Sequence, residues 1–158
     1  MPTSPTLTPR AKRILAKAFA AMRAYPETVD MGDWVYHEPG RREGRPHRPA
    51  PYCGTMACFA GHMALAAVGR RPDLKLDALY EGRRLPKYLR VAEDKLGMVS
   101  CDGIALVVLG IPDEGTQRLF HLYSWPAVFR TRYEGAKTPR GLSDAVIARI
   151  RHWVRTGE

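Results

Sequence analysis

Long apolar runs and cysteines are both scarce in this chain of 158 residues. No window approaches about 18 uninterrupted apolar residues, so no segment is predicted to span a membrane. The chain has three cysteines, an odd number that is too small for a disulfide framework and fits a reducing compartment. The first residues lack the apolar stretch of a signal peptide. We therefore expect a cytoplasmic protein with no membrane partner.

Motifs that would indicate a particular enzyme class are also missing. The phosphate-binding pattern Gly-x-x-x-x-Gly-Lys does not occur, and neither does a Gly-x-Ser-x-Gly elbow or the surroundings of a caspase or papain cysteine. Asp30 and Asp33 flank Gly32 but lack the further ligands of a calcium loop, so they are interpreted as turn residues. These absences favour a protein that is not an enzyme.

Acidic residues are missing from the first part of the chain. The whole chain has 25 Lys and Arg against 16 Asp and Glu, a formal charge of +9. Residues 1–25 hold five basic and no acidic residues, a charge of +5, whereas residues 26–52 hold four basic and five acidic ones, a charge of −1. Localised positive charge attracts phosphates and acidic surfaces. An electrostatic partner is therefore expected to meet the N-terminal segment first.

Helical periodicity dominates what is present, and no sustained period-two run indicates a strand. Thr8 and Pro9 are typical of an N-cap and a first helical position, which predicts a helix from Arg10 to Tyr25, closed by Pro26. Further helices are predicted at residues 86–96, 104–109, 112–122, 126–133, and from Thr138–Pro139 or Ser143 to about Arg155.

Residues 53–68 form the most apolar segment. The segment is rich in small residues and apolar almost all round, which is typical of a central buried helix, here about 55–68, with Thr55 as its N-cap. The expected fold is all-α: an irregular helical bundle around this helix, with a long Pro- and Arg-rich loop (26–52). Residues 1–7 are expected to be a flexible N-terminus and residues 8–158 a single helical domain. Part of the loop, Asp30–Tyr36, is expected to dock on the core in an extended form.

Four stretches of the chain occur together in a recognisable combination: Asp30-Met31-Gly32-Asp33-Trp34, Cys53-Gly54-Thr55-Met56-Ala57-Cys58-Phe59-Ala60-Gly61, Leu119-Phe120 with Trp125-Pro126, and Ala148-Arg149-Ile150. From about residue 10 onward, the chain resembles a family of small bacterial, phage or plasmid proteins that share a Cys-Gly-Thr-x-x-Cys-x-x-Gly segment. That family has no established activity, so the resemblance implies only a cytoplasmic protein of bacterial or mobile-element origin. Its members often carry an aromatic residue where this chain has His62.

Three interpretations of the block from Cys53 to His62 compete. In the first, the block is structural, since free cysteine packs as a small apolar residue and glycine permits tight helix packing. In the second, Cys53, Cys58 and His62 bind zinc, because thiolate and imidazole suit this metal. In the third, Cys53 at a helix N-terminus is a nucleophile with a lowered pKa. We adopt the structural interpretation, with no cofactor; its residues are Cys53, Gly54, Thr55, Cys58 and Gly61.

Both chemical interpretations require a histidine from elsewhere in the chain. His37 or His47 would complete a zinc tetrahedron, and either of these or His121 would act as the base for a cysteine nucleophile. Cys101 is interpreted as a buried residue at a helix start, and His152 as a surface or capping residue.

Basic side chains on the first helix and on the loop are the candidate contact residues for a partner. They are Arg10, Lys12, Arg13, Lys17, Arg41, Arg42, Arg45 and Arg48. No helix-turn-helix pair, RNA-binding signature or zinc-finger spacing accompanies them. We therefore predict a non-enzymatic accessory protein that binds a macromolecular partner, with protein favoured over nucleic acid. The alternatives are phosphate-backbone binding through helix 10–23 and loop 41–48, and a cysteine- or zinc-dependent enzyme.

Overall fold

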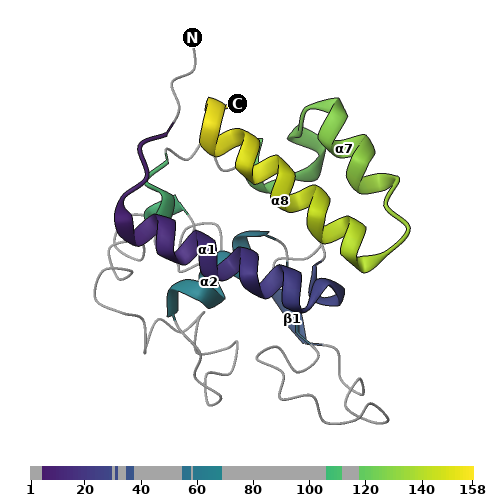
Figure 1. Cartoon of the computed structure of the whole chain (residues 1–158), viewed down its shortest axis with the longest axis horizontal. Coiled ribbons are helices and arrows are strands. Elements are labelled where there is room, and N and C mark those ends of the chain that lie inside the picture. Colours follow the sequence, from purple (N-terminus) through teal and green to yellow (C-terminus); the bar gives the residue numbers. More distant parts are fainter. Residues whose placement is uncertain are drawn as a thin grey trace.

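The computed structural model describes residues 5–29, 31, 35–37, 55–57, 59–68, 106–111 and 118–158. Most of these residues are helical, and the fold is all-α, as predicted. The elements follow one another as α1 (Pro9–Ala24), η1 (Pro26–Thr28), β1 (Val35–His37), β2 (Thr55–Ala57), α2 (Phe59–Val68), η2 (Leu122–Ser124), α7 (Ala127–Glu134) and α8 (Pro139–Thr156) (Figure 1).

Helix α1 forms as its sequence predicts. The Thr8 side chain accepts a hydrogen bond of 3.1 Å from the Ala11 amide, and Pro9 occupies the first turn, where its missing N–H is no loss. The helix ends at Ala24, two residues before Pro26. Its apolar stripe is buried and consists of Ala11, Ile14, Leu15, Ala18, Phe19, Ala21 and Met22.

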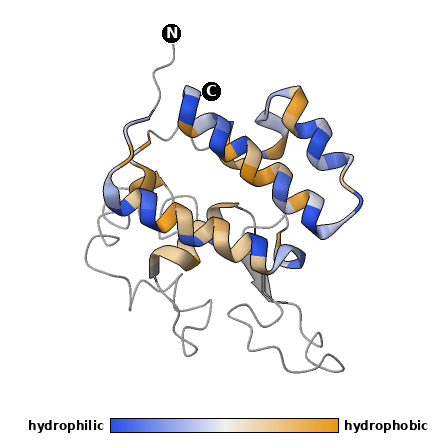
Figure 2. Ribbon diagram, viewed as in Figure 1, coloured by the Kyte–Doolittle hydropathy of each residue, from blue (hydrophilic) through white to orange (hydrophobic). Residues whose placement is uncertain are grey.

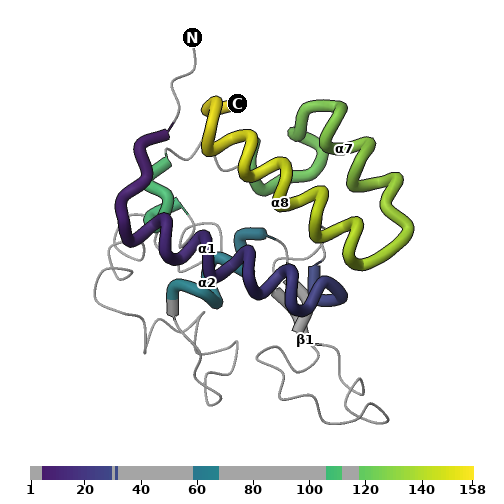
Figure 3. Tube along the Cα trace, in the orientation of Figure 1, coloured from purple at the N-terminus to yellow at the C-terminus, as the bar shows by residue number. Residues whose placement is uncertain are grey.

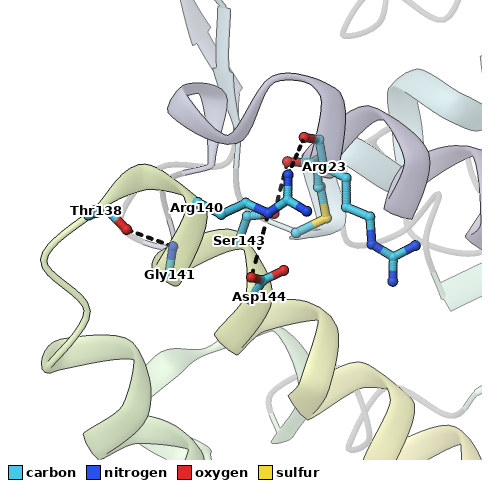
Figure 4. Close-up of polar contacts among 7 residues, drawn as sticks. Arg23, Thr138, Arg140, Gly141, Ser143 and Asp144 are labelled. Carbon is cyan, nitrogen blue, oxygen red and sulfur yellow. Dashed lines mark hydrogen bonds and ion pairs between the residues drawn. The ribbon is translucent and has the colours of Figure 1, made fainter.

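Helix α8 begins at the first of its two candidate starts. Thr138 is the N-cap and accepts a hydrogen bond of 3.1 Å from the Gly141 amide (Figure 4). Gly157 ends the helix with φ of 78°, a left-handed conformation that favours glycine. The buried side of α8 consists of Ser143, Ala145, Val146, Ile147, Arg149, Ile150 and Trp153.

The predicted N-cap role of Thr55 is wrong, because Thr55 lies in a strand. Strands β1 and β2 pair antiparallel, with Val35 opposite Ala57, Tyr36 opposite Met56 and His37 opposite Thr55. This pairing satisfies backbone groups of Thr55–Ala57. Helix α2 therefore starts at Phe59 and is shorter than the predicted helix of about 55–68.

Helix α2 lies at the centre of the described core. Phe59, Ala60, Met63 and Ala64 each have an exposed fraction of 0%. The Phe59 ring centroid lies 6.4 Å from that of Phe19 on α1 and 5.7 Å from that of Phe120. Figure 2 shows apolar colours along α2, whereas α1 and α8 alternate between polar and apolar. The predicted central apolar helix is therefore present over a shorter range.

The beginning of the predicted 26–52 loop contributes to the packed structure. Residues Pro26–Thr28 form η1, which contacts both α1 and α8. Val29 and Met31 are buried, and the Met31 amide donates a hydrogen bond of 3.0 Å to the Tyr133 hydroxyl on α7. Leu7, which the sequence places in the N-terminal segment, is also buried. Residues 38–54 lie outside the described residues.

Two further apolar segments complete the core. Residues 106–109 are helical, and Gly110, with φ of 68°, follows them as the sequence predicts. Residues 118–120 are helical, and η2 and α7 follow; α7 matches the predicted helix 126–133. Trp125 lies between the last two elements and donates a hydrogen bond of 2.9 Å to the Leu119 carbonyl. The predicted helix at 86–96 lies outside the described residues.

Helices α1 and α8 run in opposite directions (Figure 3). The first turns of α8 meet the last turn of α1: the Ser143 hydroxyl donates to the Met22 carbonyl at 2.8 Å, and Arg140 Nη1 donates to the Arg23 carbonyl at 3.4 Å (Figure 4). In a continuing helix the Met22 carbonyl would accept from residue 26, but Pro26 has no N–H. Ser143 therefore supplies the donor that Pro26 lacks.

Ser143→Ala is expected to destabilise the protein by about 1–3 kcal/mol, because the buried Met22 carbonyl then loses its hydrogen-bond donor. Urea unfolding followed by circular dichroism measures the change. Ser124→Ala, at an exposed serine in η2, is the matched control and should change stability by less than about 0.5 kcal/mol. Equal midpoints for the two variants would contradict this role of Ser143.

Candidate functional site

His62 is a core residue of α2. Its exposed fraction is 0%, and its Nε2 lies 3.4 Å from the carbonyl oxygen of Thr28 in η1. A carbonyl oxygen can only accept, so Nε2 carries the proton in this contact. The side chain thereby connects the central helix to the turn that follows α1.

Burial keeps the His62 imidazole neutral. Removal from water lowers the pKa of His62 from its ordinary value of 6.5 to about 4, although the Thr28 carbonyl partly offsets this by favouring the protonated ring. A neutral imidazole with a pKa this low is a poor proton acceptor near pH 7. These properties give His62 a structural place in the core.

The other residues of the Cys53–His62 block are only partly described. Thr55 lies in β2 and Gly61 is buried on α2, whereas Cys53, Gly54 and Cys58 lie outside the described residues. Within the ranges that the structure describes, no three His, Cys, Asp or Glu side chains gather to form a metal site. The zinc and nucleophile interpretations thus remain predictions.

The histidines proposed as helpers lie on different elements of the chain. His37 lies in β1, opposite Thr55. His121 is exposed just before η2, and the half-buried His152 ring lies 5.0 Å from the Phe129 ring. His47, Cys101, Asp30 and Asp33 lie outside the described residues.

Arg149 is a buried cation that the sequence analysis did not single out. Its exposed fraction is 1%, and its two terminal nitrogens donate to the main-chain oxygens of Glu158 and, at 3.2 Å, Arg118. The guanidinium carbon lies 5.7 Å from the centroid of the Phe129 ring. Burial lowers the pKa of Arg149 from its ordinary value. The side chain therefore joins α8 to α7, the segment before η2 and the last residue.

The helical spacing of α8 carried the signal for this burial. Val146, Arg149, Ile150 and Trp153 follow the i, i+3, i+4, i+7 pattern of one helix face. An arginine within such a stripe indicates a buried guanidinium with fixed partners rather than a surface charge. The contacts of Arg149 explain a structural role for this side chain.

The basic side chains of α1 form the exposed part of the candidate site. Arg10, Lys12, Arg13 and Lys17 are all exposed. Among the described residues, Lys12, Arg13 and Lys17 have no carboxylate partner; the ion pair that is described joins Arg140 and Asp144 on α8, 3.6 Å apart. The remaining predicted contact residues, Arg41, Arg42, Arg45 and Arg48, lie outside the described residues.

An open pocket of about 440 Å³ lies beside this basic helix. It is bounded by the N-terminal segment, by residues 12–19 of α1 and by Val154 near the end of α8. Sequence analysis missed it, because its walls come from the two ends of the described chain.

No family model matches the chain, and the searches of curated proteins and of solved structures also gave no match. None of the described helices has the length and apolarity that crossing a bilayer requires. The resemblance to a Cys-Gly-Thr family therefore stays a prediction. The candidate site rests on the arrangement of this chain's own residues.

The burial of His62 predicts a pH-dependent stability. Below pH 6.5 the unfolded chain takes up a proton that the folded chain does not bind until about pH 4. The contribution is therefore present in full above pH 6.5 and is lost as the pH falls toward 4, by about 3 kcal/mol in total. Chemical unfolding of the wild type and of His62→Gln, which keeps an N–H donor, measures this loss. Parallel stability curves for the two proteins over this pH window would exclude the buried neutral histidine.

Arg149→Met is expected to lower stability by about 2 kcal/mol, because two main-chain oxygens lose their donors while the apolar stem is retained. Arg149→Lys should also destabilise, since one ammonium cannot reproduce the fork of a guanidinium. Arg132→Met, at an exposed arginine on α7, is the control. Thermal unfolding compares the three variants. If both Arg149 variants melted at the wild-type temperature, the two hydrogen bonds of the guanidinium would not stabilise the fold.

Proposed function

We propose that this protein is a non-enzymatic accessory protein that binds an acidic macromolecular partner through the exposed basic face of α1. The observation that supports the proposal is the set of exposed cations Lys12, Arg13 and Lys17, which have no carboxylate partner among the described residues. The whole of α1 contains no acidic residue, so nothing on the helix neutralises them. Such a face raises the local concentration and association rate of an acidic partner.

A protein is favoured over nucleic acid as the partner. Apolar side chains adjoin the cations at the pocket beside α1, whereas a phosphate-backbone site needs only charge and hydrogen-bond donors. In keeping with the few cysteines, we place the protein in the cytoplasm of a bacterium or of a host of a mobile element. The packed position of His62 supports action by contact rather than by chemistry.

Reversing the charge of the basic face should abolish partner capture. We expect Arg13→Glu with Lys17→Glu to lose the proteins that the wild type retains from a lysate of its host. The matched control combines Arg132→Glu with Lys137→Glu, two exposed cations beyond α1 that give the same change in net charge. Affinity capture with mass spectrometry compares the three proteins.

Capture of the same proteins by all three would contradict the proposed function. Binding of the wild type to a DNA or RNA duplex in a salt series tests the alternative. Strong binding at low salt that the basic-face variant loses would favour a phosphate backbone as the partner, and no binding at low salt removes that alternative.

A further inference from the structure

The pocket beside α1 has an apolar lining with a route to solvent. Six of its lining residues are apolar and come from three segments: Pro5, Leu7, Leu15, Ala16, Phe19 and Val154. Leu7, Leu15 and Phe19 are 6 to 8% exposed, whereas Ala16 is exposed. The pocket has a volume of about 440 Å³ and is open to solvent, so it is a surface groove that a side chain of a partner can enter.

Cations lie at the edge of this apolar pocket. Lys12 lines it directly from α1. On α8, the guanidinium carbon of the exposed Arg151 lies 5.7 Å from the centroid of the Phe19 ring, which is part of the lining. Among the described residues neither cation has a carboxylate partner, and Asp144, the acidic residue within α8, pairs with Arg140 at the far end of that helix.

Apolar lining and cationic edge together specify the chemistry of an occupant. We infer that this open pocket, a groove beside α1, binds an acidic amphipathic peptide segment of a partner protein. The apolar side chains of the peptide lie against Leu15 and Phe19, and its carboxylates lie at Lys12 and Arg151. A helical segment presents apolar groups at i, i+3, i+4 and i+7 and acids elsewhere, which matches both features. A nucleic acid backbone would leave the lining unfilled. This inference rests on the proposed function and names the partner's binding element.

A synthetic peptide tests the groove directly. The probe is a fluorescein-labelled helical peptide with Leu and Phe at i, i+3, i+4 and i+7 and mostly Glu elsewhere, and its control has the same composition in scrambled order. Anisotropy is measured with the full chain, with Ala16→Glu and with Ala24→Glu. Both alanines are exposed on α1, but only Ala16 lines the pocket, and both substitutions change the net charge equally. Circular dichroism checks that each variant folds.

We expect the ordered peptide to bind the wild type and Ala24→Glu, and to bind Ala16→Glu at least about tenfold more weakly, the size of one central contact. The scrambled peptide should bind weakly to all three. Equal binding of the peptide to Ala16→Glu and Ala24→Glu would contradict the inference that the peptide occupies the groove. If the double variant Arg13→Glu with Lys17→Glu then still fails to bind the peptide, the proposed function of the basic face stands and only the groove is excluded.

Two other occupants are separate outcomes that would also overturn the inference. A DNA duplex that displaces the peptide, with equal affinity for the Ala16→Glu and Ala24→Glu variants, would assign the cations to phosphate binding. Self-association of the wild type in sedimentation velocity, lost in Ala16→Glu and kept in Ala24→Glu, would assign the groove to a second copy of this chain.

Discussion

The hydrogen bond from Ser143 to the Met22 carbonyl is the constraint on which the arrangement of the outer helices depends. Pro26 follows α1 and cannot donate to that carbonyl, so a donor has to come from another element. Arg140 does the same for the next carbonyl, that of Arg23. These contacts hold the start of α8 against the end of α1. The antiparallel course of the two helices follows, and it lets Val154 line one pocket with Leu15 and Phe19 of α1.

Helix α2, packed against α1, contains the last four residues of the block from Cys53 to His62. The helix has no polar face, and its buried residues pack against α1 and Phe120. His62 lies within that packing as a neutral imidazole, with its Nε2 directed to the Thr28 carbonyl. Phe59, Ala60 and His62 of this block therefore belong to the core. The binding that we propose is placed on the outer surface, where cations of α1 adjoin an apolar groove.

Short sequence patterns predicted α1 and α8 correctly. The caps at Thr8 and Thr138 and the apolar stripes of α1 and α8 each lie within a few residues of what they determine. Thr55 was misassigned because its partner, His37, is 18 positions away in the sequence, and strand pairing is a non-local choice that no short window contains. Of the candidate contact residues, those on α1 are exposed as expected.

Arg149 and the groove show two different limits of sequence reasoning. Periodicity places Arg149 within the buried stripe of α8, but its charge suggests the surface, and only its carbonyl partners resolve that conflict. The groove has no local signal at all, since Leu7 and Val154 come to line one pocket only through the antiparallel docking of α8 on α1. Tertiary contacts between the two ends of the chain determine it.

Methyl NOE spectroscopy of the full chain tests that docking most directly. The antiparallel arrangement predicts cross-peaks from the Val154 methyl groups to Leu7, Leu15 or Phe19, which line the groove together with Val154. Cross-peaks from Val154 to Met22, near the end of α1, or no cross-peak from Val154 to α1 or Leu7, would contradict the arrangement and the groove that depends on it.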